Sequence, residues 1–263
     1  MNSIGTVESL WRYPVKSMAG EQLPHAFLGF AGVYGDRLYA FRDTAAPAGF
    51  PFLTAREQEH MLLFHPSFRN SAAMDLPPNL AEAQALAPGV TPVYATPAEV
   101  AVDVTTPTGQ TIPVDSPEML DFLSHGLRKR HHLSLIHSDR AITDCRPVSL
   151  FATQTVHQLA SELGATLDKR RFRSNIYLDL SASNGFSEDA LVGHKLRIGP
   201  TVTLSVLDRD PRCKIITLDP ETAAPSPDVI RQVARAHAGT AGVYAAVLVE
   251  GLINPGDDIT LLD

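Results

Sequence analysis

Apolar and polar positions alternate in residues 201–206 with a two-residue period, which is typical of a β-strand that buries one face. Short, largely apolar stretches predict further strands at residues 4–10, 38–41, 176–179, 244–250 and 259–262. Residues 99–104 and 110–114 predict a hairpin, because a turn rich in Thr, Pro and Gly joins them. Residues 43–50 predict a second hairpin loop, which returns through residues 51–56.

Helical patterns are fewer and shorter. Ser116-Pro117 predicts a helix start, because Ser is a good N-cap and Pro is favoured at the first helical position. Apolar residues with helical spacing predict a second helix over residues 153–163, closed by Gly164. A third follows Ser226-Pro227. Since strands outnumber helices, we expect an α+β fold that is mostly β, with barrel-like sheets.

The change from the hairpin to the Ser116 helix predicts a domain boundary. With 263 residues the chain can form one large domain or two small ones. We therefore expect a small N-terminal β domain over residues 1–115 and a second domain over residues 116–263.

Composition excludes several classes of protein. A net charge of −7 argues against nucleic-acid binding, which needs a basic surface. No segment is long and apolar enough to predict a membrane span, and the N-terminus lacks the pattern of a signal peptide. Two cysteines cannot form a disulfide framework or a four-cysteine iron–sulfur cluster, so we expect a cytoplasmic protein without a cluster of its own.

Cys213 is the main candidate for chemistry. Arg212 and Lys214 flank it, and cationic neighbours favour the thiolate, the form that binds metals and acts as a nucleophile. The strand at 201–206 is predicted to run into a turn at Asp210-Pro211, which would place Cys213 just after a strand end. From the residues alone, a small buried hydrophobic side chain remains the alternative.

Cationic residues recur at predicted strand ends and turns. They are Lys16, Arg37 and Arg56 in the first half and Arg170, Arg171 and Arg173 ahead of the strand at 176–179. Arginines can bind phosphate or carboxylate with two hydrogen bonds, although solvation is the alternative for each. Thr153 and Thr155 fall at a predicted helix N-terminus, where either an anion or simple capping fits. The histidines of the basic run at 128–132 have no partner at metal-site spacing.

Six short motifs, in this order, are similar to those of one known family. They are residues 12–17 (Arg-Tyr-Pro-Val-Lys-Ser), 35–37 (Gly-Asp-Arg), 52–56 (Phe-Leu-Thr-Ala-Arg), 171–175 (Arg-Phe-Arg-Ser-Asn), 192–199 (Val-Gly-His-Lys-Leu-Arg-Ile-Gly), and Arg212-Cys213 followed by 217–222 (Thr-Leu-Asp-Pro-Glu-Thr). Through them the chain resembles the MOSC-domain proteins with an N-terminal MOSC-type β-barrel domain, the group that contains mitochondrial amidoxime-reducing components and their bacterial relatives. The resemblance covers nearly the whole chain, with residues 1–115 as the N-terminal barrel and 116–263 as the MOSC domain.

The resemblance implies that the protein binds the molybdenum cofactor. In such proteins the cysteine at the position of Cys213 coordinates molybdenum beside the pterin dithiolene, and a thiolate suits this sulfur-rich environment. The residues expected to contact the cofactor are Lys16, Ser17, Arg37, Arg56, Thr153, Arg173, Asn175, Arg212 and Tyr244. Pyridoxal phosphate is not expected.

Three positions depart from the family pattern. Ala152 stands where a serine is usual, which removes one hydroxyl contact near the Thr153 helix. Ser174 replaces a proline, and Pro211 stands where a serine often precedes Arg212.

The resemblance implies a molybdenum-dependent reductase of N-hydroxylated compounds or N-oxides. The alternatives are a cofactor or sulfur carrier that uses a persulfide on Cys213, and a binding module without chemistry. Since the chain ends at Asp263 and shows no Gly-rich dinucleotide motif, we expect a separate electron-donor protein to supply electrons. The expected substrate is a small molecule, and neither nucleic acid nor membrane is an expected partner.

Overall fold

The computed structural model describes residues 3–87, 90, 92–94, 100–127 and 131–262. It divides into two compact units that are discontinuous in sequence. The barrel unit comprises residues 1–11, 22–34 and 144–263, and the second unit comprises residues 12–21 and 35–143. The sequence pattern predicts a single boundary at residues 115 and 116, because a local pattern cannot reveal that residues 3–10 pair with strands from the far end of the chain.

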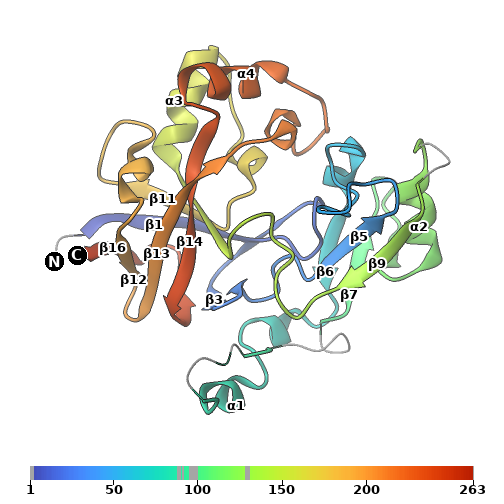
Figure 1. Ribbon diagram of the computed structural model, residues 1–263, viewed down its shortest axis with the longest axis horizontal. Coiled ribbons are helices and arrows are strands. Elements are labelled where there is room, and N and C mark those ends of the chain that lie inside the picture. Colours follow the sequence, from blue (N-terminus) through green and yellow to red (C-terminus); the bar gives the residue numbers. More distant parts are fainter. Residues whose placement is uncertain (1–2, 88–89, 91, 95–99, 128–130, 263) are drawn as a thin grey trace. The chain divides into compact units, whose positions relative to one another are not determined.

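A closed barrel of seven strands forms the centre of the barrel unit (Figure 1). Its order is β11-β10-β14-β13-β12-β16-β1, and β1 pairs again with β11 to close it. The bounds are β1 Ser3–Arg12, β10 Val148–Ala152, β11 Ile176–Leu180, β12 Lys195–Ile198, β13 Val202–Pro211, β14 Thr240–Val249 and β16 Asp258–Leu262. The pairing of β10 with β11 is parallel, and the barrel's other pairings are antiparallel. The expected mostly β fold with a barrel is therefore confirmed.

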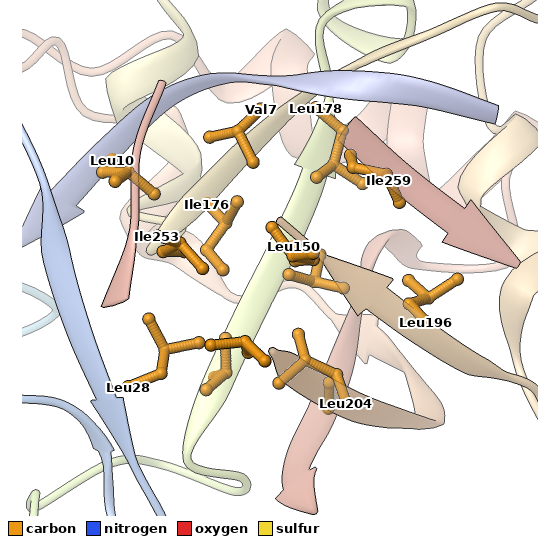
Figure 2. Close-up of a cluster of buried hydrophobic side chains, with 14 of the residues drawn as sticks. Val7, Leu10, Leu28, Leu150, Ile176, Leu178, Leu196, Leu204, Ile253 and Ile259 are labelled. Carbon is orange, nitrogen blue, oxygen red and sulfur yellow. The ribbon is translucent and has the colours of Figure 1, made fainter. Parts of the chain in front are cut away.

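Inward-pointing aliphatic side chains fill the barrel (Figure 2). In β13, for example, Val202, Leu204 and Val206 are buried while the residues between them are partly exposed, as the two-residue period predicts. Leu150, Ile176 and Leu178 meet them from β10 and β11. This apolar core makes the barrel a rigid support for the side chains at its strand ends.

Two helices cover an aromatic cluster beside the barrel. Helices α3 (Thr153–Leu163) and α4 (Pro227–Ala236) lie side by side in the barrel unit (Figure 1). Their apolar residues pack with Phe151, Phe172 and Tyr177, and the rings of Phe151 and Phe172 stack with centroids 4.2 Å apart. Both helices lie where the sequence predicts them, and Gly164 ends α3 with a left-handed φ of 62°.

Short elements complete the barrel unit. The strands are β2 Glu21–Leu23, which extends the sheet beyond β1, and β3 Ala26–Gly29, β4 Gly32–Val33 and β15 Gly251–Ile253, which form a small sheet of their own. The 3-10 helices are η3 Lys169–Phe172, η4 Ser187–Leu191 and η5 Lys214–Thr217.

The second unit is built from smaller sheets. Strand β5 (Tyr39–Asp43) pairs with β9 (Leu133–His137), and β6 (His65–Phe68), β7 (Val102–Thr105) and β8 (Thr111–Pro113) form a meander. The helices are α1 Leu80–Gln84, α2 Pro117–Ser124, η1 Glu59–Leu63 and η2 Ser71–Met74. The β7–β8 hairpin and the α2 helix are confirmed, and the Ser116 Oγ accepts a hydrogen bond from the Met119 N–H at 3.2 Å.

Three local predictions need correction or qualification. The predicted return through residues 51–56 lies antiparallel to β5, with a bridge between Phe52 and Arg42 and a hydrogen bond from the Leu53 N–H to the Phe41 carbonyl at 2.8 Å, but it is too short to count as a strand, and β5 also pairs with β9. The predicted turn at Asp210-Pro211 is wrong, since β13 continues through both residues. Register shifts before Asp208 and before Pro211 interrupt the ladder, and such irregularities accommodate a proline without an N–H. In the basic run, residues 128–130 lie outside the described residues.

Within the described part of the chain, no helix has the length and apolarity needed to cross a membrane.

Candidate functional site

Cys213 lies at the end of two barrel strands. Strand β13 ends at Pro211, which pairs with Thr240 at the start of β14, and the Arg212 N–H donates to the Gly239 carbonyl at 2.9 Å. Cys213 then forms the N-cap of η5, and its carbonyl accepts a hydrogen bond from the Ile216 N–H at 3.3 Å. Its thiol is free and partly buried. The position after a strand end agrees with the expectation from the sequence, although the strand is longer than predicted.

Arg212 is pinned from several directions. Its Nε donates to the Ala241 carbonyl at 2.6 Å and its Nη1 donates to the Phe172 carbonyl at 2.8 Å. The guanidinium carbon lies 5.3 Å and 5.4 Å from the ring centroids of Phe151 and Phe172, within cation–π range. Nη2 lies 2.8 Å from Asp210 Oδ2, but at an angle that leaves this buried atom without a hydrogen bond among the described residues. The guanidinium of Arg212 is therefore fixed in position, and its Nη2 can still donate a hydrogen bond.

Tyr244 joins this group from β14. Its backbone pairs with Asp208 of β13, and its side chain hydrogen-bonds to Asp210. Burial raises the pKa of Tyr244, and the charge of Asp210 raises it further. Tyr244 is thus a neutral phenol whose O–H donates to the Asp210 carboxylate. Sequence reasoning missed Asp210 because it assigned the residue to a turn.

Arg173 and Asn175 lie between η3 and β11. Asn175 is buried, its Oδ1 accepts from the N–H and Oγ of Ser149 at 3.3 Å each, and its Nδ2 donates to the Trp11 carbonyl at 3.4 Å. The Asn175 side chain therefore ties β10, β11 and β1 together, which fixes the chain immediately after Arg173.

The second unit contains four predicted site residues, on two neighbouring segments and a loop with aromatic residues: Lys16, Ser17, Arg37 and Arg56. The Lys16 N–H donates to the Tyr39 carbonyl at 2.8 Å, and the Arg37 N–H donates to the Tyr13 carbonyl at 2.7 Å, so residues 13–17 run alongside residues 37–39. Lys16 Nζ donates to the Ile142 carbonyl at 3.0 Å, and the Ile142 N–H donates to the Arg37 carbonyl at 2.8 Å. These contacts bring Lys16, Ser17 and Arg37 together.

Aromatic rings and one carboxylate support these cations. Lys16 Nζ and the guanidinium of Arg56 lie 5.2 Å and 4.7 Å from the centroid of the Phe50 ring. Arg37 lies 4.8 Å from the ring centroid of Tyr13 and forms an ion pair with the buried Asp36. Lys16, Arg37 and Arg56 are therefore each supported by aromatic or charged neighbours, rather than being simply solvated.

Backbone strain marks three of the predicted residues. Ser17, Arg37 and Arg173 have left-handed φ values of 68°, 48° and 52°. Each such conformation costs a residue other than glycine about 1–3 kcal/mol and persists only where the surroundings enforce it. Strained residues of this kind are frequent at functional sites, although Phe186, Ala223 and Ala238, which are not predicted site residues, share this conformation.

The N-terminus of α3 differs from the expectation of an anion site. The carboxylate of Glu188, on η4, accepts hydrogen bonds from the Thr155 Oγ1 at 2.7 Å and 2.8 Å and from the Ala152 N–H at 3.4 Å. The protein's own carboxylate thus occupies the place predicted for an anion at Thr155. Thr153 lines a separate cavity of about 400 Å³ with Glu8, Lys169 and Asp179, and no other predicted site residue lines that cavity among the described residues.

Glu188 gives a prediction about stability and pH. Burial raises the pKa of Glu188 above its ordinary value of 4.5, despite the hydrogen bonds from Thr155. A carboxyl group with a raised pKa in the folded state stabilises it most at low pH, and this contribution is lost as pH rises through the folded pKa. We expect Glu188→Gln to be more stable than the wild type at pH 8, with the advantage disappearing as pH falls to 4.5. Urea unfolding across this range measures it.

Glu162→Gln is the control of opposite sign. Burial would raise the pKa of Glu162, but hydrogen bonds from His237, Gln158 and Gln232 lower it overall. This variant should be less stable than the wild type at pH 8 and approach it on acidification. Equal pH profiles for the two variants would contradict the assignment of Glu188.

Cys145 and the histidines do not extend the site. Cys145 is exposed, and its neighbour Arg146 forms an exposed ion pair with Asp208 at 2.9 Å. His131, from the basic run, lies 2.6 Å from Asp43 Oδ2. Among the described residues, no three His, Cys, Asp or Glu side chains gather in a way that could hold a metal ion.

Comparison with known proteins identifies both halves of the chain. The MOSC domain model matches residues 129–260, and the MOSC N-terminal beta barrel domain model matches residues 4–124. No curated protein matches the chain in sequence. Among solved structures, the chain is similar to YuaD from Bacillus subtilis, with 12% identity over 98% of this chain and 94% of that one and a TM-score of 0.45. It is also similar to YiiM from Geobacillus stearothermophilus, with 18% identity over 49% of this chain and 67% of that one and a TM-score of 0.37.

Proposed function

The chain belongs to the MOSC-domain family, and we propose on that basis that it holds the molybdenum cofactor through Cys213 and reduces N-hydroxylated compounds or N-oxides. The observation that carries this proposal is the free, partly buried thiol of Cys213, presented at a strand end beside the pinned cation Arg212. A thiolate is the ligand that a soft, sulfur-rich metal environment needs.

The residues of the barrel unit fit such a cofactor. Cys213 would supply the one protein ligand to the metal, and the buried Nη2 of Arg212 retains a donor for an anionic or accepting group. Arg173, held in a strained conformation, is a second cation of the same unit. Lys16, Ser17, Arg37 and Arg56 remain predicted cofactor contacts, and the cationic cluster they form within the second unit supports that prediction.

Each residue has a distinct role in this proposal. The bound cofactor would supply two-electron oxygen-atom chemistry, so that a hydroxylamine, two electrons and two protons give an amine and water. Arg212 keeps the strand end rigid, which positions the Cys213 sulfur. Tyr244 stays neutral over the physiological range because burial raises its pKa, so it acts through hydrogen bonds rather than charge.

The second candidate function is a sulfur carrier with a persulfide on Cys213. The same free thiol favours it, because a persulfide also needs an accessible sulfur at a supported position. The two functions differ in what the purified protein contains when it is made in a host that produces the cofactor. Metal-free protein that releases sulfur on treatment with cyanide would favour the carrier over the reductase.

The reductase function predicts dependence on an outside electron donor. Two cysteines cannot hold a four-cysteine cluster, and the sequence has no Gly-rich dinucleotide-binding motif. We therefore expect the purified chain to reduce a hydroxylamine-type substrate with reduced viologen but not with NADPH or NADH alone. Steady turnover on NADPH by the purified chain would overturn the need for a separate redox partner.

A further inference from the structure

Asp210 connects the two side chains that flank the Cys213 segment. It is 3% exposed, on the irregular end of β13, and it is three residues before Cys213. Its Oδ2 lies 2.8 Å from Arg212 Nη2, and the same carboxylate accepts the hydrogen bond of Tyr244. A buried carboxylate with two such partners orients both of them, because each partner loses an interaction if it turns away.

The hydrogen bond to Asp210 determines what Tyr244 can offer to a ligand. A phenol has one hydrogen to donate and lone pairs that accept. Because the carboxylate of Asp210 can only accept, it takes the phenolic hydrogen. Tyr244 is then an acceptor toward anything else, and a ligand group that meets it must carry an N–H or O–H.

The orientation of the Arg212 guanidinium is also fixed by its neighbours. The backbone carbonyls of Phe172 and Ala241 and the carboxylate of Asp210 surround its guanidinium. Gly242, with a φ of 77°, leaves the space it needs: a Cβ there would lie 2.9 Å from Arg212 Nη2 and 2.7 Å from the Phe151 ring. The guanidinium can therefore offer an outside group only a donor, from Nη2.

We propose that Asp210 is a positioning residue that sets the hydrogen-bonding pattern of the cofactor site, with Tyr244 as acceptor and Arg212 as donor. This inference rests on the proposed function and adds the chemistry of recognition. The cofactor would present an N–H to Tyr244, as the amino or amide groups of a pterin can, and an accepting oxygen or nitrogen to Arg212. A ligand with the reverse pattern would leave a buried polar group unpaired, which binding sites discriminate against strongly.

Asp210→Asn tests this pattern without changing the shape of the side chain. Asparagine lacks the negative charge that lies 2.8 Å from Arg212 Nη2, and a donating NH2 replaces one of the two accepting oxygens. Either the phenol turns its hydrogen toward the ligand or the amide NH2 opposes the guanidinium. We expect molybdenum and pterin to leave the Asn variant about 10–100-fold faster during dialysis than they leave the wild type, the range by which groups around a metal typically affect its retention.

Asp208→Asn is the matched control. Asp208 lies two residues earlier on the same strand, but its ion pair with Arg146 is exposed, and the Tyr244 side chain hydrogen-bonds to Asp210 instead. This variant should retain the cofactor like the wild type. If Asp210→Asn released cofactor no faster than Asp208→Asn, the inference would be wrong.

A double-mutant cycle separates positioning from simple loss of stability. If Asp210 acts through Tyr244, Asp210→Asn should have a smaller effect on cofactor release in a Tyr244→Phe background than in the wild type. Additive effects of the two substitutions would overturn the role through Tyr244. Thermal unfolding of each variant shows whether a change in release merely follows a change in fold.

A measurement on protein without cofactor keeps this inference separate from the proposed function. The Raman Fermi doublet of tyrosine reports whether a phenol donates or accepts a hydrogen bond, and subtraction of the Tyr244→Phe spectrum isolates Tyr244. We expect a strong donor in the wild type and in Asp208→Asn, and a weaker donor in Asp210→Asn. An unchanged doublet in Asp210→Asn would overturn the inference even if the wild type binds molybdenum. If the wild type bound no molybdenum while the doublet still showed a weaker donor in Asp210→Asn than in the wild type, the result would count against the proposed function alone.

Discussion

Cys213→Ala is expected to reduce viologen-driven reduction of a hydroxylamine-type substrate to background. Substituting groups around a metal typically costs about 10–100-fold in affinity or activity, and loss of the single protein ligand should cost more. The initial rate per chain, measured with saturating reduced viologen, checks this.

The fold should survive this substitution. Cys213 is partly buried and belongs to neither the barrel core nor the aromatic cluster, so removing its sulfur leaves no large internal cavity. Cys145→Ala is the control, because Cys145 is exposed and lies in none of the predicted motifs. Full activity in Cys213→Ala, or its loss only in Cys145→Ala, would contradict the assignment.

Removing Arg173 or Arg37 is expected to weaken retention of the cofactor. Each guanidinium is predicted to make a charge-assisted contact to an anionic group, worth about 1.5–3 kcal/mol, which corresponds to roughly 10–150-fold in affinity. The molybdenum content of Arg173→Ala and Arg37→Ala after dialysis should fall well below that of the wild type. Arg231→Ala, which removes an arginine with an exposed side chain, should behave like the wild type.

Arg173→Gly separates the side chain from the backbone. Glycine accepts a φ of 52° without strain, so this variant removes the guanidinium and also relieves the backbone. We expect Arg173→Gly to lose cofactor as Arg173→Ala does, but to unfold at a higher temperature than Arg173→Ala. If activity per bound molybdenum collapsed instead, Arg173 would act on the substrate rather than on retention.

Local features of the sequence predicted helices α2, α3 and α4 correctly. Ser116, Pro117 and Gly164 determine where α2 begins and α3 ends, because capping involves only residues a few positions apart. The alternation in residues 202–206 likewise predicted the buried face of β13. What the sequence did not reveal depends on distant partners. The closure of β1 onto β11 joins Gly5 to Leu180, and β5 pairs with the distant strand β9 in addition to the neighbouring segment.

In the candidate site too, the sequence reveals residues that stand out locally but not those whose role depends on distant partners. Arg212 and Cys213 stand out in the sequence because they are adjacent and belong to a recurring motif. Asp210 and Glu188 do not, since each acquires its role from side chains on other elements, Tyr244 on β14 and Thr155 on α3. An Asp before a Pro is typical of a turn, and only the register of β13 with β14 shows that this one is buried in a strand.

The molybdenum content of three purified proteins tests the central claim most directly. Wild type, Cys213→Ala and Cys145→Ala are made in a host that produces the cofactor, and metal is measured per chain by mass spectrometry. We expect about one molybdenum per chain in the wild type and in Cys145→Ala, as one thiolate ligand per site requires, and close to none in Cys213→Ala. Molybdenum retained by Cys213→Ala and lost from Cys145→Ala would show that Cys213 is not the ligand.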